Sequence, residues 1–254
     1  MTPTVDLNSD MGEGFGRWSL GDDAALLKIV TSANVACGFH AGDPDVMEAT
    51  MREAVANGVA IGAHPGFPDL AGFGRREMRL PGATLANLIR YQVGAASAMA
   101  ASVGGRLNHL KLHGALANMA AEDAAMARIC YEAALGVQDD LIVMVLAATE
   151  QERAAREIGC ALAREIFADR AYEDDATLVS RSKPGAVIHD PARAAARMVE
   201  MVTAGAIIAE SGRRIATSID TICLHGDTPE AVAIARAVRE ALETAGITLA
   251  PLAR

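Results

Sequence analysis

The chain has 254 residues, 51% hydrophobic and 22% charged, a balance that favours one folded domain over residues 1–254 and argues against disorder. Aromatic residues make up 4% and the formal net charge is −9, so neither base stacking nor phosphate-backbone binding is expected, and nucleic acid is not an expected partner. No signal-like start and no apolar run near the ~20 residues of a membrane span occur, so we expect a cytoplasmic protein without membrane contact.

Short β-type runs alternate with helical runs along the chain. We expect strands at 5–10, 34–40, 59–65, 107–114, 141–147, 161–168, 185–189, 221–227 and 247–252. Helices are expected at 22–32, 43–58, 84–105, 123–135, 150–159, 190–205 and 228–246. Repeated strand-then-helix units indicate parallel strands with right-handed crossovers. Such units in a chain of this size favour an α/β fold, a TIM-like (β/α) barrel of seven or eight strands, with a doubly wound open sheet as the alternative.

The cysteines are scattered and form no CxxC pair. We expect reduced, buried thiols at Cys37, Cys130, Cys160 and Cys223 rather than a disulfide framework. Cys37 and Cys223 lie near strand ends, which leaves a catalytic thiol as the alternative at these two positions.

Strand parity separates apolar from ionisable side chains. In the first strand Asp6, Asn8 and Asp10 share one face, and Val5 and Leu7 take the other. Later strands divide in the same way, and their polar faces carry Asn34 and His40, then His64, then His109, Lys111 and His113, then Cys223, His225 and Asp227. The ionisable groups fall at the carboxyl ends of the strands, where a β/α barrel builds its active site.

Five of the six histidines end strands or follow them closely: His40, His64, His113, His225 and, less closely, His189. A single histidine of this kind is more often a hydrogen-bonded core or surface imidazole. The joint pattern favours one shared polar site.

Two long loops and one glycine-rich run add anion-binding potential. The loops at 66–78 and 167–185 bring Arg75, Arg76, Arg170, Arg181 and Lys183 near strand ends, with solvated charged loops as the alternative. The run at 12–16 offers a phosphate cradle or a tight turn. No GxxxxGK[ST] loop occurs, so ATP would need an atypical site.

Several stretches resemble the LamB/YcsF family, the A subunits of bacterial 5-oxoprolinase. They are "DLNSDMGEGFG", "SANVACGFHAGDP", "GVAIGAHPGFPDLAGFGRR", "YQVGA", "HLKLHGAL", "REIFADRAY", "LVSRS" and "CLHGD", in family order from Asp6 to Asp227. Leu112 stands where the family usually has proline and Ala117 where it has tyrosine, whereas Lys111, His113 and Asn118 match.

The resemblance implies a barrel of the glycoside hydrolase/deacetylase type. It also implies ATP-dependent opening of 5-oxo-L-proline to L-glutamate, with hydrolysis of ATP to ADP and phosphate, in a complex with two further subunits, B and C. The alternatives are a stand-alone metal-dependent deacetylase or amidohydrolase and a non-catalytic lactam-binding subunit.

We expect the chemistry to lie with Asp10, His64, Lys111, His113 and Glu165. Asp10 is the first candidate for general base and Glu165 the second, because a carboxylate in a partly dry pocket can have its pKa raised into a useful range. His64 and His113 are candidate acids at the departing nitrogen, and Lys111 is a candidate to hold the oxyanion or a phosphate.

Substrate or nucleotide binding is expected from a wider set, in which Arg75 or Arg170 clamps the substrate carboxylate. The set comprises Asn8, Glu13, Asn34, His40, Asp43, Arg75, Arg170, His225 and Asp227. A divalent cation at Asp10, His40 and His64 is an open alternative, because deacetylase-like relatives of the family use an Asp/His/His set.

Overall fold

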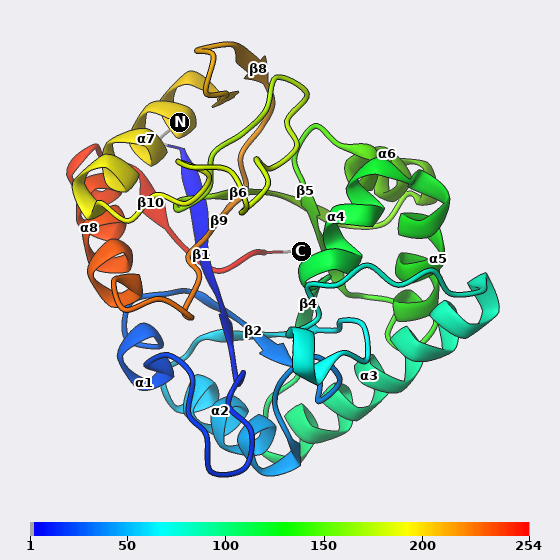
Figure 1. Cartoon of the computed structure of the whole chain (residues 1–254). Helices are drawn as coiled ribbons and strands as arrows, with labels where there is room; N and C mark the ends of the chain where they lie inside the picture. The colour runs from blue at the N-terminus through cyan, green and yellow to red at the C-terminus, as the bar shows by residue number, and fades with distance from the viewer. Residues whose placement is uncertain (1–2, 254) are drawn as a thin grey trace.

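In the computed structural model, which describes residues 3–253, parallel strands close into a barrel with helices around it (Figure 1). The barrel order is β1, β2, β3, β4, β5, β6 and β9, and β9 pairs with β1 to complete the ring. The strands are β1 Thr4–Met11, β2 Ser32–Ala36, β3 Ala60–His64, β4 Leu107–Lys111, β5 Ile142–Leu146, β6 Leu162–Phe167 and β9 Thr221–Cys223. The predicted β/α barrel is confirmed, with seven strands in the ring, and the open sheet is excluded by the β9–β1 pairing.

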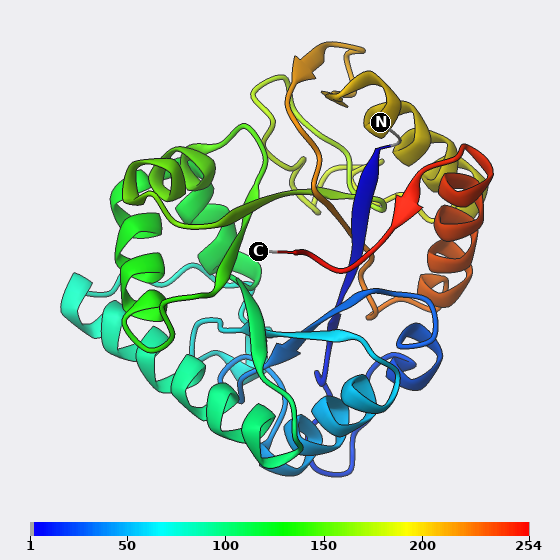
Figure 2. The same ribbon diagram turned by 180° about the vertical axis from the view of Figure 1, so that it is seen from behind.

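The amino-terminal end of the barrel is covered by the end of the chain. The short strand β10 (Thr248–Leu249) pairs with the start of β1, and the following segment runs across the barrel, as Figure 2 shows from behind. Leu252 packs against Ile142 and Met144 inside the barrel, and its carbonyl accepts a hydrogen bond of 3.2 Å from Asn108 Nδ2. The carboxyl ends of the strands lie at the opposite end.

Helices line the outside of the barrel and bury apolar stripes against it (Figure 1). They are α1 Asp23–Leu26, α2 Pro44–Ala56, α3 Gly82–Ser102, α4 Gly114–Glu122, α5 Ala124–Leu135, α6 Glu150–Ile158, α7 Pro191–Ala204 and α8 Ala231–Thr244, with a 3₁₀ turn η1 at Leu70–Gly72. None of the helices within residues 3–253 is long and apolar enough to cross a membrane.

The parity expected for the strands is present in the barrel. Val5 and Leu7 belong to the apolar core shared with the helices. On the inner face, Thr221 Oγ1 donates to Asp6 Oδ2 at 2.6 Å and accepts from Asn8 Nδ2 at 2.7 Å. Asp6, Asn8 and Thr221 are therefore joined in a hydrogen-bonded network on the inner face of the barrel, which satisfies these buried polar groups.

The structure differs from the sequence predictions in four places. The segment at 185–189 is not a strand, and only an isolated bridge joins Val187 to Arg170. The helix expected at 22–32 is reduced to α1. Helix α4 was missed because it starts directly after β4 at His113, whose side chain makes no capping hydrogen bond and gives no start signal. The antiparallel hairpin of β7 (Ala206–Ile208) and β8 (Arg214–Ala216) was also not predicted.

Candidate active site

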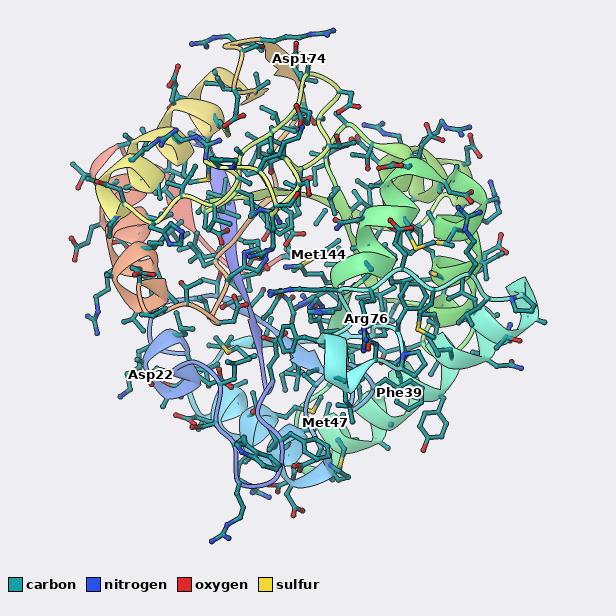
Figure 3. The ribbon with its side chains drawn as sticks, in the orientation of Figure 1. Asp22, Phe39, Met47, Arg76, Met144 and Asp174 are labelled. Atoms are coloured by element: carbon teal, nitrogen blue, oxygen red, sulfur yellow. The ribbon has the colours of Figure 1, made fainter. Side chains whose placement is uncertain are left out.

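A cavity of about 490 Å³ opens at the carboxyl ends of the strands, a volume that suits a small molecule. Its lining comes from five strands of the ring, β1, β3, β4, β5 and β6, and from both arginine-bearing loops. Figure 3 shows Met144 of β5 near the middle of the barrel and Arg76 on the loop after β3. The ionisable lining residues are Asp10, Glu13, His64, Arg75, Glu77, Lys111, His113, Glu122, Glu165, Arg170, Arg181, His225 and Asp227.

Lys111 is the buried cation at the floor of the cavity. Its Nζ lies 2.8 Å from Asp10 Oδ1, 2.9 Å from Glu165 Oε1, 3.2 Å from Asn8 Oδ1 and 3.0 Å from Cys223 Sγ. Burial alone would lower the pKa of Lys111, but the charge of Asp10, together with that of Glu165, raises it well above its usual value. Lys111 therefore stays charged inside the barrel.

Asp10 does not have the raised pKa that its burial suggested. Burial raises the pKa of the Asp10 carboxyl, yet the charges of His64 and Lys111 outweigh this effect and hold the pKa well below its usual range. His64 Nε2 lies 3.3 Å from Asp10 Oδ2. The expectation of a raised pKa at Asp10 was wrong, because the sequence does not show that His64 and Lys111 converge on this carboxylate.

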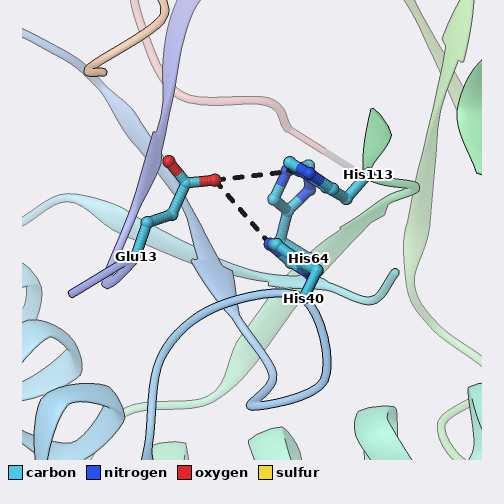
Figure 4. A group of neighbouring side chains, drawn as sticks. All are labelled: Glu13, His40, His64 and His113. Atoms are coloured by element: carbon cyan, nitrogen blue, oxygen red, sulfur yellow. Dashed lines mark hydrogen bonds and ion pairs between the residues drawn. The ribbon is translucent and has the colours of Figure 1, made fainter. Parts of the chain in front are cut away.

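Glu13 is the carboxyl whose pKa is raised. Burial, then the charges of Asp10 and Asp227, raise the pKa of Glu13 well above its usual value. Its Oε1 lies 3.7 Å from His40 Nε2 and 3.7 Å from His113 Nδ1, as the dashed lines in Figure 4 mark.

His40, His64 and His113 gather around Glu13 (Figure 4). The His40 and His113 rings stack with centroids 3.7 Å apart, and His64 stands edge-on to both. Burial lowers the pKa of His40 well below its usual value and lowers that of His113 to about 3. A Cβ at Gly66 would lie 2.7 Å from His40 Nδ1, so this glycine gives the His40 ring its space.

His225 is held by an aspartate that the sequence did not single out. Its Nδ1 lies 2.8 Å from both carboxylate oxygens of Asp169, which follows β6 and is buried. Burial would raise the pKa of Asp169, but the charge of His225 outweighs this and lowers it. Asp169 lies two residues beyond the end of β6, and His225 lies two residues beyond the end of β9. These matching positions were the sequence signal that could have identified Asp169 as the partner of His225.

The arginines of the two loops differ in what they can bind. Arg170 is committed within its own loop, because its Nη2 donates to Val179 O at 2.7 Å. Arg75 Nη2 lies 2.6 Å from Asp227 Oδ2 across the mouth of the cavity. Arg181 is exposed and lines the cavity, which makes Arg75 and Arg181 better placed than Arg170 to meet an anion.

Four predicted positions lie beside or below the cavity rather than in its lining. Asn34 and Asn8 form a layer beneath it, with Asn34 Nδ2 donating to Asn8 Oδ1 at 2.7 Å and to Asp10 Oδ1 at 2.8 Å. His40 lies behind the lining. Asp43 caps α2 and accepts from the Asp45 N–H at 2.9 Å, so the structure does not bring it to the other predicted residues.

The proposed metal candidates fall into two groups. His40 and His64 converge with Glu13 and His113, and their ligand atoms lie within 4.8 Å of one another. Asp10 belongs to a separate group with Cys223 and His225. The structure therefore does not gather Asp10, His40 and His64 as one set.

The remaining sequence features have structural explanations. The four cysteines are free, and Cys37, Cys130 and Cys223 are buried whereas Cys160 is partly buried. Gly12 has a φ of 67°, which is the left-handed conformation of a tight turn. Leu112 and Ala117, which depart from the family pattern, both line the cavity.

A closed parallel barrel with a buried lysine between two carboxylates, and with three imidazoles lining a small cavity, defines a β/α-barrel protein with a polar small-molecule site. More particularly, the chain belongs to the LamB/YcsF family, whose sequence profile matches residues 5–254. The resemblance seen in the sequence is confirmed.

Curated relatives and solved structures agree with this membership. A Ruegeria pomeroyi protein named as the A subunit of 5-oxoprolinase is 64% identical over 98% of this chain and 99% of its own length. The crystal structure of the lactam utilization protein from Thermus thermophilus is 44% identical, covers 98% of this chain and all of that chain, and has a TM-score of 0.92. A peptidoglycan N-acetylglucosamine deacetylase domain from Eubacterium rectale shares the fold at 9% identity and a TM-score of 0.53, covering 100% of this chain and 90% of that one.

Proposed function

We propose that this chain is the A subunit of a cytoplasmic ATP-dependent 5-oxoprolinase. With two partner subunits, B and C, it opens 5-oxo-L-proline to L-glutamate while ATP is hydrolysed to ADP and phosphate. The relatives named as A subunits of 5-oxoprolinase and the lactam utilization protein support the substrate class. The observation that carries the proposal is the buried Lys111 between Asp10 and Glu165 at the floor of a cavity large enough for a small molecule.

The lactam is a stable amide, so its carbonyl carbon needs activation. Transfer of the ATP γ-phosphoryl group to the amide oxygen releases ADP and makes the ring carbon electrophilic. Water then adds to this carbon, the C–N bond breaks as the nitrogen takes a proton, and a second water releases phosphate from the acyl phosphate to leave glutamate. The Lys111 ammonium stabilises negative charge on the oxygens of the addition step.

His225 and Asp169 are suited to the proton transfers. Because a carboxylate only accepts, the His225 Nδ1 carries the proton shared with Asp169, and its Nε2 is left with a lone pair. His225 lines the cavity, so Nε2 takes the proton of the attacking water and returns it to the ring nitrogen. Asp10, with its lowered pKa, is a weak base and instead holds the Lys111 ammonium in place.

His64 and His113 are less suited to acid catalysis than the sequence suggested. Each donates its one N–H to a backbone carbonyl, His64 Nδ1 to Lys111 at 2.9 Å and His113 Nε2 to Phe73 at 2.8 Å. We assign binding of the substrate carboxylate or the transferred phosphoryl group to Arg75 and Arg181 at the mouth of the cavity.

A glutamate-release assay tests the proposal. Purified chain is incubated with 5-oxoproline, with and without ATP, and with and without the proteins encoded beside it. The proposal expects glutamate only when ATP and the partner proteins are both present. Release without ATP would favour the stand-alone amidohydrolase, and full activity of the partners in the absence of this chain would favour the lactam-binding alternative.

A further inference from the structure

His64 and His113 point lone pairs at each other inside the barrel. A backbone carbonyl can only accept a hydrogen bond, so the contacts to Lys111 O and Phe73 O place the protons on His64 Nδ1 and His113 Nε2. The other two ring nitrogens, His64 Nε2 and His113 Nδ1, then carry no proton in the neutral imidazoles, and they lie 3.0 Å apart. Two acceptors at this distance repel each other unless a positive charge lies between or beside them.

His40 and Glu13 add buried polar atoms without hydrogen-bond partners at the same place. Both ring nitrogens of His40 and Oε1 of Glu13 are buried and have no hydrogen-bond partner among residues 3–253. His40 is fully buried. Buried polar atoms without partners are rare, and here they lie together and face His64 and His113 (Figure 4).

We propose that Glu13, His40, His64 and His113 bind one divalent transition-metal cation. Three imidazole nitrogens and one carboxylate oxygen, within 4.8 Å of one another, form a ligand set of the zinc type. Ligating histidines usually donate the second ring N–H to a carbonyl or carboxylate, and His64 and His113 both do so. The bound cation attracts the facing lone pairs of His64 and His113 and so removes the repulsion between them.

The imidazole-rich set selects the metal. Imidazole suits Zn²⁺, Co²⁺, Ni²⁺ and Fe²⁺, whereas Mg²⁺ prefers oxygen ligands, so Mg²⁺ bound with ATP does not fill this site. When bound, such a cation supplies Lewis-acid polarisation of an oxygen in the cavity, which Glu13, His64 and His113 line. The inference goes beyond the proposed reaction, and its test needs no turnover, so either can fail without the other.

Cobalt titration of the full chain tests the site. Protein stripped with a chelator is titrated with Co²⁺, binding is followed by the visible absorption of the bound ion, and elemental analysis gives the metal per chain. We expect one equivalent of Co²⁺, displaced by Zn²⁺ and not by Mg²⁺. Glu13→Gln and His113→Ala should each weaken binding by more than about 10-fold.

Three controls make each outcome decisive. His189→Ala removes an exposed imidazole that lies 3.6 Å from Glu230 Oε2, and the variant should bind as the parent does. His225→Ala tests the group of Asp10, Cys223 and His225, and should also retain the ion. Circular dichroism checks that the variants fold. If His113→Ala does not fold, Glu13→Gln, which preserves the size of the side chain, provides the test of the site. Absence of a stoichiometric ion in the parent, or equal affinity in Glu13→Gln, would overturn the site and leave a shared proton between His64 and His113.

Discussion

The ammonium of Lys111 lies 2.8 Å from the Asp10 carboxylate, and both side chains are buried at the carboxyl ends of β4 and β1. Removing one partner of a buried ion pair leaves an uncompensated charge, which costs about 3–5 kcal/mol. We therefore expect Lys111→Met to lower the free energy of unfolding by about this amount, because Asp10 and Glu165 would then face each other without a cation.

Urea denaturation of the parent and the Lys111→Met variant measures this cost. Arg153→Met is the matched control, since Arg153 forms an ion pair with Glu150 on the exposed face of α6 and should change the midpoint little. Equal midpoints for Lys111→Met and the parent would show that the buried pair does not stabilise the barrel.

Asp169 should act through His225 as a positioning residue. We expect Asp169→Asn to lower kcat by about 100-fold or more with a small change in KM, because the amide no longer fixes the ring or favours the imidazolium. The acid limb of the pH–rate profile should also move to lower pH. Asp174→Asn, on the outer rim of the same loop (Figure 3), is the control and should leave the profile unchanged. A purely structural role would lower activity without moving the limb.

His109 makes the stability of the protein sensitive to acid. Burial, then the charge of Lys111, lowers the pKa of His109 from 6.5 to about 3, so the unfolded chain binds a proton here that the folded chain does not. The stability that the protein gains by keeping His109 neutral is fully present above pH 6.5, and it is lost as the pH falls from 6.5 towards 3. At pH 4 the loss is on the order of 3 kcal/mol for this group alone.

Unfolding titrations between pH 7.5 and about 4, with a chelator present, measure this dependence. His109→Gln keeps a donor toward Asn34 Oδ1, which now accepts from His109 Nε2 at 2.8 Å. The slope of the unfolding free energy against pH should be shallower in this variant, by the amount that corresponds to uptake of about one proton on unfolding. An unchanged slope would mean that His109 is not held neutral in the folded protein.

Much of the fold and of the site follows from side-chain alternation. Period-two alternation placed Asp10 and Lys111 at strand ends on the inner face, because one face of each strand must pack against helices. Family resemblance and strand parity led to the same barrel. Helix α4 was not predicted because His113 provides no capping signal. The 185–189 segment was wrongly predicted as a strand because a short apolar run does not specify strand pairing.

Contacts between distant residues set the remaining features. The low pKa of Asp10 arises from His64 and Lys111 on two other strands, and the sequence does not give their distances from Asp10. The facing nitrogens of His64 and His113 depend likewise on the backbone carbonyls that fix their protons. Residue types and parity could therefore be read from the sequence, whereas protonation and pairing required the structure.

Asp10→Asn offers the most direct test of the buried Asp10–Lys111–Glu165 group as the chemical core. The amide keeps the shape of Asp10 but removes the negative charge that holds Lys111. The measurement is the rate of ATP-dependent glutamate release from 5-oxoproline by the complex reconstituted with the variant, compared with the parent complex at equal assembly. We predict a loss of about 100-fold or more. An Asp10→Asn complex that turns over 5-oxoproline at the parent rate would contradict the account.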